Sequence, residues 1–120
     1  MELRWDAVTI DCKDPELLGR FWSELLGTEV RGQWEQYVGL RPTAPGLPRL
    51  VLQRTDDPRP AKNTVHLDLH VPTVADIATA VARVVELGGS EVADREQGGQ
   101  RWSTVADPEG NVFCLVADAD

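Results

Sequence analysis

The chain has little of what disulfide cross-links, membrane insertion and export require. Its 120 residues include two cysteines, Cys12 and Cys114, which lie far apart and form no Cys-x-x-Cys motif. No uninterrupted apolar run approaches the ~20 residues of a membrane-spanning helix. The first residues do not combine a basic region with an apolar one, as a signal peptide does. We therefore expect two reduced thiols, no membrane partner and a cytoplasmic location.

Basic residues are also scarce. Lysine and arginine together number 12 against 20 aspartates and glutamates, which gives a formal net charge of −8. Nucleic-acid binding needs clustered basic residues to neutralise phosphates, so no nucleic-acid partner is expected. A cationic small molecule would be tolerated electrostatically. With 42% hydrophobic residues, a chain of this length is expected to form one domain with its own core.

The spacing of apolar and turn-forming residues predicts one order of elements twice: a strand, a helix and three strands. In the first half these elements are expected over residues 3–12, 14–27, 28–31, 34–40 and 49–54. In the second half they are expected over residues 64–71, 73–88, 91–95, 101–106 and 112–117. Turns are expected at 32–33, 97–99 and 107–111. Asp14-Pro15 and the pair Thr73 and Asp76 have the residue types of helix N-termini.

A short stretch of sequence also recurs. Residues 24–30 (Glu-Leu-Leu-Gly-Thr-Glu-Val) match residues 86–92 (Glu-Leu-Gly-Gly-Ser-Glu-Val) at five of seven positions. Together with the repeated order of elements, this match predicts an α+β fold of two tandem βαβββ modules in a single domain, 1–120. The expected boundaries are about 1–57 for module one, about 58–63 for a linker and about 64–120 for module two.

Both histidines lie in the strand expected over residues 64–71, which reads Thr-Val-His-Leu-Asp-Leu-His-Val. Successive side chains of a strand point to opposite faces. His66, Asp68 and His70 therefore share one face, and four apolar residues share the other. The polar face suits proton transfer or metal binding, and it is also consistent with residues that only face water.

Four motifs in chain order resemble the vicinal oxygen chelate superfamily, which includes glyoxalase I, extradiol dioxygenases, fosfomycin-resistance enzymes and bleomycin-binding proteins. They are Ala-Val-Thr-Ile with Lys-Asp-Pro at 7–15, Phe-Trp-Ser-Glu-Leu-Leu-Gly at 21–27, Val-His-Leu-Asp-Leu at 65–69 and Asp-Pro-Glu-Gly-Asn at 107–111. The resemblance implies that each module turns one sheet face to its helix and curves the other around a ligand cavity. It also implies a homodimer.

Most metal ligands of the resembled family are absent from this sequence. In metal-dependent members, each module supplies one ligand near the start of its first strand and one on its last strand. The corresponding positions here are Ala7, His66, Cys114 and a position at or next to Leu52. Only His66 keeps the ligand chemistry, because Cys114 offers a thiol and the other two offer no donor. No divalent metal and no other cofactor is therefore expected.

The resemblance places polar residues of both modules on the cavity lining. By equivalence of the modules, Thr9 and Asp11 are expected to join His66, Asp68 and His70 on this lining, with Cys114 from the last strand. Trp34 and Trp102 are also expected to bind the ligand, through their indoles. In a catalytic protein His66 would be the general base, and Asp68 or Asp11 would orient it. A carboxylate beside an imidazole fixes its tautomer and stabilises the proton that it accepts.

Three of these residues also have a purely structural interpretation. Trp34 and Trp102 lie beside glycine-bearing turns in matching regions of the two modules. Their indoles would stack on a flat or cationic ligand, or would only pack across strands at a sheet edge. Cys114 is either a small buried hydrophobe or a nucleophile, which would require a nearby base.

Three functions remain open at this point. The first is a metal-independent binding protein that sequesters a small aromatic or cationic molecule, as bleomycin-binding relatives do. The missing ligands, the acidic charge and the tryptophans favour it. The second is a lyase or isomerase acting on a carbonyl compound, which the paired His66 and Asp68 favour. The third is an accessory or regulatory domain without chemistry of its own.

The donor count yields a first prediction. Protein purified without a chelator is expected to contain far less than one equivalent of nickel, iron, zinc or manganese per chain. The reason is that one imidazole and one thiol stand where the resembled family uses four ligands. Inductively coupled plasma mass spectrometry of the desalted protein measures the metal content. A stoichiometric amount of any of these metals would contradict metal-independent binding.

Overall fold

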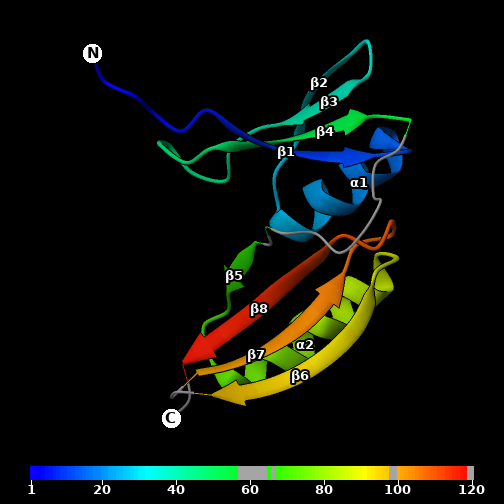
Figure 1. Ribbon diagram of the computed structural model, residues 1–120. Coiled ribbons are helices and arrows are strands. Elements are labelled where there is room, and N and C mark those ends of the chain that lie inside the picture. Colours follow the sequence, from blue (N-terminus) through cyan, green and yellow to red (C-terminus); the bar gives the residue numbers. More distant parts are fainter. Residues whose placement is uncertain (57–64, 66, 98–99, 119–120) are drawn as a thin grey trace. The chain divides into compact units, whose positions relative to one another are not determined.

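The computed structural model describes residues 1–56, 65, 67–97 and 100–118. The chain divides into two compact units, Met1–Ala61 and Lys62–Asp120. Each unit contains one helix and one four-stranded sheet (Figure 1). The α+β fold of two βαβββ modules is thereby confirmed. No helix among the described residues is long and apolar enough to cross a membrane.

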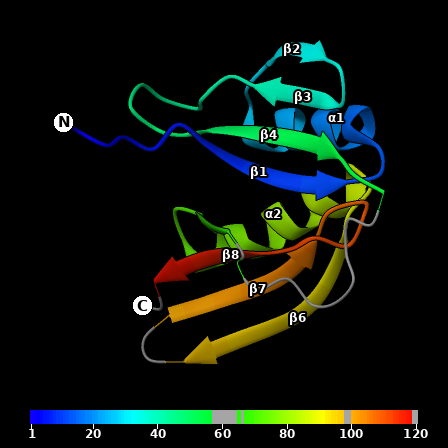
Figure 2. The same ribbon diagram turned by 45° about the horizontal axis from the view of Figure 1, so that its top comes forward.

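The first unit has a sheet with the strand order β1-β4-β3-β2 (Figure 2). β1 is parallel to β4, and the other neighbours are antiparallel. The elements are β1 (Ala7–Cys12), α1 (Pro15–Leu26), β2 (Val30–Trp34), β3 (Tyr37–Leu40) and β4 (Arg49–Arg54). Helix α1 contacts β2, β3 and β4, so it covers one face of the sheet.

Helix α1 begins and ends where its sequence predicts. The Asp14 carboxylate accepts a hydrogen bond from the Leu17 amide at 3.1 Å. Gly27 ends the helix with a left-handed φ of 69°, which glycine adopts without steric cost. Gly19 has to be small, because a Cβ there would lie 2.8 Å from a methyl carbon of Val38 on β3. The large side chains that the helix buries are those of Leu18, Phe21 and Trp22.

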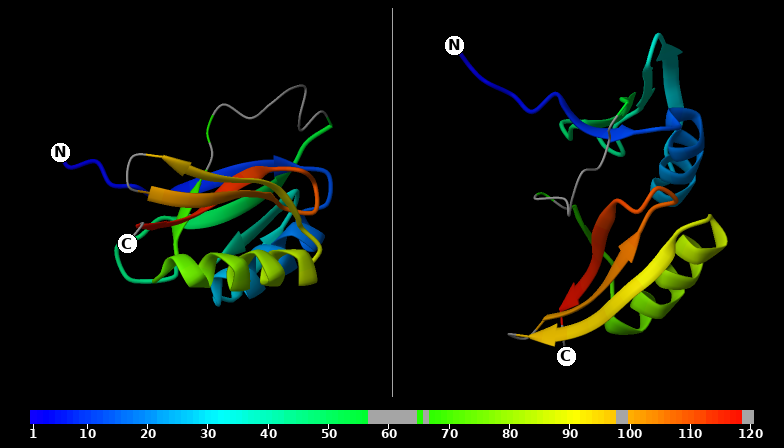
Figure 3. Two further views of the ribbon diagram at one scale, coloured as in Figure 1. Left: turned by 90° about the horizontal axis from the view of Figure 1, so that it is seen from below. Right: turned by 45° about the vertical axis from the view of Figure 1, so that its right-hand side comes forward.

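The second unit repeats this arrangement with the strand order β5-β8-β7-β6 (Figure 3). Its elements are β5 (Asp68–His70), α2 (Val74–Glu86), β6 (Ser90–Gln97), β7 (Gln100–Ala106) and β8 (Val112–Asp118). β5 is parallel to β8, and the other neighbours are antiparallel. Helix α2 contacts β6, β7 and β8 and covers one face of the sheet.

Helix α2 starts with the expected cap. The Asp76 carboxylate accepts hydrogen bonds from the Thr73 amide at 3.0 Å and from its hydroxyl at 2.8 Å. Apolar side chains spaced along the helix then meet alternate residues of β7 and β8, which is the usual way for an amphipathic helix to cover a sheet. The buried apolar residues of this core include Val71, Ile77, Val84, Val105, Phe113, Leu115 and Ala117.

Both strands that open a module are shorter than the sequence predicts. β1 begins at Ala7 rather than at residue 3, because its ladder with β4 starts there and residues 1–6 are exposed. β5 comprises Asp68–His70 of the strand expected over 64–71. His66 and Thr64 lie outside the described residues, and so does the linker expected over 58–63.

The turn between β2 and β3 also differs from the prediction. It lies at Glu35 and Gln36 rather than at 32–33, so Trp34 ends β2 instead of beginning the next strand. Glu35 adopts a left-handed φ of 49°, which closes a two-residue hairpin without a glycine. Gly32 is left inside β2, where it pairs with Gly39.

The repeated stretches at 24–30 and 86–92 both lead from a helix into a strand, but the two helices end at different points. α1 continues to Leu26, whereas α2 ends at Glu86, which corresponds to Glu24 of the first copy. Gly88, at the position of Leu26, has a φ of 110°, which a leucine avoids. The repeat therefore preserves the order of the elements and not the exact helix length.

A single buried carboxylate holds the turn before β8. Asp107 is only 2% exposed. Its Oδ1 accepts hydrogen bonds from the Glu109 amide at 2.9 Å and the Asn111 amide at 3.0 Å. Its Oδ2 accepts a third, at 2.8 Å, from the Asn111 side-chain amide. The predicted turn at 107–111 is thus fixed by side-chain hydrogen bonds to Asp107.

Replacing this carboxylate is expected to destabilise the protein. Asp107→Ala removes three hydrogen bonds to a charged acceptor and leaves their donors in a partly buried turn. We expect the free energy of unfolding to fall by about 3 kcal/mol, measured by urea denaturation followed by tryptophan fluorescence. Glu96→Ala, which removes an exposed carboxylate of β6, is the control and is expected to change it by less than about 0.5 kcal/mol. Equal effects of the two substitutions would contradict the role assigned to Asp107.

Candidate functional site

We call the sheet face opposite each helix the open face of that unit. Residues paired in register across neighbouring strands point to the same face, so the ladders identify its members. In the first unit two rows cross the sheet, and they consist of Asp11, Gln53, Tyr37 and Trp34, and of Thr9, Val51, Gly39 and Gly32. Arg49 lies two residues before Val51 on β4 and belongs to the same face. These residues form the first open face.

Trp34 combines packing with exposure on this face. Its ring centroid lies 5.8 Å from that of Tyr37, with the planes inclined by 31°. A Cβ added to Gly39 would lie 3.1 Å from Cη2 of the indole, so the ring sits directly above that glycine. Even so, Trp34 is 45% exposed. Of the two interpretations of this tryptophan, cross-strand packing is observed, and the exposed area leaves room for stacking as well.

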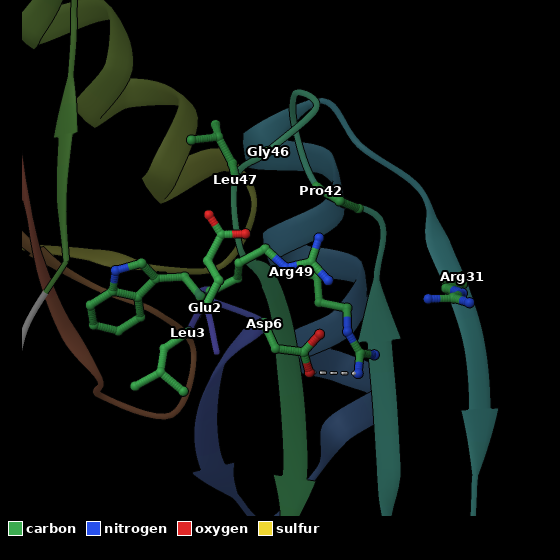
Figure 4. A pocket seen from close by; sticks show the side chains of 10 residues that line it. Glu2, Leu3, Asp6, Arg31, Pro42, Gly46, Leu47 and Arg49 are labelled. Carbon is green, nitrogen blue, oxygen red and sulfur yellow. Dashed lines mark hydrogen bonds and ion pairs between the residues drawn. The ribbon is translucent and has the colours of Figure 1, made fainter.

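Arg49 is held at the edge of the first open face by an ion pair. Its Nη2 lies 3.5 Å from Oδ2 of Asp6, and the two side chains are 24% and 85% exposed, respectively. The pair borders a hollow of about 820 Å³ formed by the chain before β1, the loop before β4 and two arginines of the sheet. Figure 4 shows the Asp6–Arg49 contact, with Arg31 set apart on its own strand.

The structure places the predicted residues Thr9, Asp11 and Trp34 together on the first open face, where all three are exposed. Their role in binding stays a prediction. Tyr37 and Arg49 were not predicted. The alternation of side chains is readable in β3 and in β4 alone. Which residues meet across them depends on the pairing of β2 with β3 and of β3 with β4, whose registers no local motif reveals.

The second open face carries a different set of groups. Asp68, Cys114 and Thr104 form one row across β5, β8 and β7, and His70, Val116 and Trp102 form the next. Asp68 and His70 are exposed, and Trp102 is half-buried. The structure thus brings four of the predicted residues onto one face. His66, the predicted general base, lies outside the described residues.

The thiol of Cys114 is surrounded by groups with opposing effects. Its burial raises the pKa of the thiol, and the Asp68 carboxylate raises this pKa further through its negative charge and a hydrogen bond. The Thr104 hydroxyl, whose oxygen lies 3.8 Å from Sγ, lowers it. The net effect is a raised pKa, so Cys114 is a neutral thiol near pH 7. This favours the interpretation of Cys114 as a small buried residue over that of a nucleophile.

The donor set does not fit the metal centre that the resemblance implies. Because Cys114 pairs with Asp68 and Val51 pairs with Thr9, the structural counterpart of Cys114 in the first unit is Val51. This is one residue before Leu52, which is fully buried. Ala7 and Val51 have no donor atom, so Cys114 alone contributes a ligand among the three positions described. Within the described residues, no group of three His, Cys, Asp or Glu side chains is placed to hold a metal ion.

The surroundings of Cys114 generate a prediction about its reactivity. Asp68→Asn removes the negative charge, lowers the thiol pKa and increases the thiolate fraction at any given pH. We expect alkylation of Cys114 by iodoacetamide at pH 8 to become about threefold faster, measured by mass spectrometry of the peptide that contains it. Asp94→Asn makes the same charge change on β6 and serves as the control. Cys12 is completely buried, so alkylation of Cys12 would show that a variant has unfolded. An unchanged rate in Asp68→Asn would contradict the assigned electrostatics.

Several solved structures share this fold. A glyoxalase/bleomycin resistance protein/dioxygenase family enzyme from Burkholderia phytofirmans PsJN has a TM-score of 0.83 at 16% identity, and the match covers 97% of this chain and 99% of that chain. The fosfomycin resistance protein FosX from Listeria monocytogenes has a TM-score of 0.77 at 17% identity, covering 99% and 96%. A hypothetical protein from S. aureus has 0.76 at 20% identity, covering 98% and 94%. At such identities the likeness shows the fold alone.

Sequence comparison gives the family. No curated protein matches this sequence. The model of the family described as glyoxalase-like domain matches residues 7–116, from the first residue of β1 into β8. Because this match spans nearly all of both units, the resemblance to the vicinal oxygen chelate superfamily is confirmed. The chain belongs to the glyoxalase-like domain family.

Proposed function

We propose that this protein binds a small, flat aromatic molecule on its first open face and needs no metal to do so. The observation that carries the proposal is the indole of Trp34, which stays 45% exposed although it packs on Tyr37 and over Gly39. A large ring that is already held in place offers stacking area at a small entropic cost.

The backbone beneath the indole supports stacking. Gly32 and Gly39 are paired neighbours in the row beside Trp34 and Tyr37. A Cβ at Gly32 would lie 3.9 Å from the indole, and one at Gly39 would lie 3.1 Å from it. The ring therefore lies low on the sheet, above two residues without side chains. A flat ligand can approach its exposed side without meeting a side chain from these two positions.

Binding without turnover is favoured by what the first open face contains. Both histidines of the chain belong to the second unit, and Cys12 lies in the row of β1 that faces α1. The described residues of this face thus offer hydrogen bonds, charge and aromatic area, and no side chain that ordinarily exchanges protons near neutral pH. Metal independence is supported by Ala7 and Val51, which occupy two of the ligand positions and have no donor atom.

A lyase or isomerase reaction remains the second candidate, because Asp68 and His70 are exposed on one face of β5. Its base would be His66. The hydrogen bond between Asp68 and Cys114 argues against Asp68 as a dedicated partner of an imidazole. If a His66→Ala variant converted a carbonyl substrate as fast as the unmodified protein, this second candidate function would be excluded.

The proposed function predicts which tryptophan matters. Isothermal titration calorimetry with 2-naphthamide, a flat neutral probe, is expected to show binding that Trp34→Ala weakens about tenfold or more, because the stacking surface is lost. Trp102→Ala is the control, since it removes the half-buried indole on the open face of the second unit, at the position that corresponds to Tyr37 of the first. A loss in Trp102→Ala and none in Trp34→Ala would contradict the assignment to the first open face. No binding of flat aromatic probes by the unmodified protein would contradict the function itself.

A further inference from the structure

We infer that the aromatic ligand is an anion, a flat aryl carboxylate whose ring stacks on Trp34 and whose carboxylate binds the guanidinium of Arg49. This inference rests on the proposed function and adds the chemical class of the ligand. It is carried by the position of Arg49 beside the indole, the weakness of the contact that now occupies Arg49, and the charge of the adjoining hollow.

Arg49 and Trp34 border the same point of the sheet. A Cβ at Gly39 would lie 3.1 Å from Cη2 of the indole and 3.5 Å from Nη1 of Arg49. Aromatic and cationic groups are therefore neighbours above one glycine. A ligand that stacks on the exposed indole has its substituents within reach of the guanidinium. A cationic ring would be repelled at this place, whereas an anionic one gains a partner.

The present partner of Arg49 is easily exchanged. The Asp6 carboxylate lies 3.5 Å from Nη2, and its side chain is 85% exposed. Exposed ion pairs of this kind contribute little net stability. Arg49 itself is three-quarters buried, at 24% exposed, so its guanidinium is already oriented. A ligand carboxylate that binds both nitrogens of the fork replaces a long single contact with the stronger two-bond geometry.

The surroundings of Arg49 attract anions although the chain as a whole is acidic. The hollow beside it is lined by Arg4, Arg31 and Arg49, against two carboxylates, Glu2 and Asp6. Three positive groups against two negative ones give this place a positive balance in a protein of net charge −8. Local charge of this kind raises the concentration of oppositely charged ligands at a site.

The class of ligand follows from these three groups. The indole selects a planar ring, the guanidinium fork selects a planar two-oxygen anion, and their nearness requires the carboxylate to be attached at or close to the ring. Exchange with Asp6 means that the ligand has to compete with a carboxylate of the protein itself. Removing that competitor is therefore expected to strengthen binding.

The inference is tested by comparing 2-naphthoate with 2-naphthamide, which differ in charge and little in shape, by calorimetry on the full chain. We expect the unmodified protein to bind the carboxylate about tenfold more tightly than the amide. Arg49→Met is expected to abolish this preference while still binding the amide. Arg54→Met makes the same charge change at the other end of β4 and is expected to keep the preference.

Asp6→Asn supplies a second, independent test. It is expected to tighten binding of 2-naphthoate about threefold and to leave 2-naphthamide unchanged, because it removes the competing carboxylate. Glu2→Gln, with the same charge change in the same hollow, is the control and is expected to have a smaller effect. Equal binding of the two probes by the unmodified protein, or a preference that survives Arg49→Met, would overturn the inference and leave the proposed function standing. Failure of both probes to bind would overturn both.

Discussion

The register of one parallel strand pair in each unit decides which side chains can act together. A parallel pair cannot be joined by a tight turn, so β1 meets β4, and β5 meets β8, only after a helix and a hairpin have intervened. In each unit the second strand of the hairpin, β3 or β7, then pairs with the last strand, β4 or β8. A slip of β1 by one residue against β4 would turn Thr9 toward the helix and Ile10 away from it. The apolar side chains of each strand have to be buried against the helix. Their burial therefore also determines which side chains lie on the open face.

Much of this architecture follows from local sequence. Asp14, Gly27 and the Thr73–Asp76 pair mark helix ends, and each does so through its own hydrogen bonds or dihedral angle. The glycine at position 32 predicts a turn at 32–33, and this prediction is wrong. The chain instead turns at Glu35, which tolerates a positive φ, and places glycine inside the strand. Local rules assign turn residues by frequency, whereas pairing across the hairpin decides where the turn lies.

The candidate site was accessible from sequence only in part. The alternation in β1 and β5 was enough to group Thr9 with Asp11, and Asp68 with His70, because a strand needs no partner to define its two faces. The sequence alone does not predict a role for Arg49, because that role depends on its position beside Trp34 and Gly39. These residues become neighbours only when β3 has paired with the strands on both sides of it. The environment of Cys114 was likewise invisible, because Thr104 and Asp68 become its neighbours only through two separate ladders.

The two units use one architecture for different chemistry. The first open face holds aromatic rings and a guanidinium, and the second holds a thiol, a carboxylate and an imidazole. Gly39 gives the first face a particular sequence requirement. A methyl group there would press on the indole, so a relative could keep Trp34 and Arg49 and still lose the proposed stacking surface. A search for proteins that share this chemistry should therefore demand glycine at the floor of the sheet together with the tryptophan and the arginine.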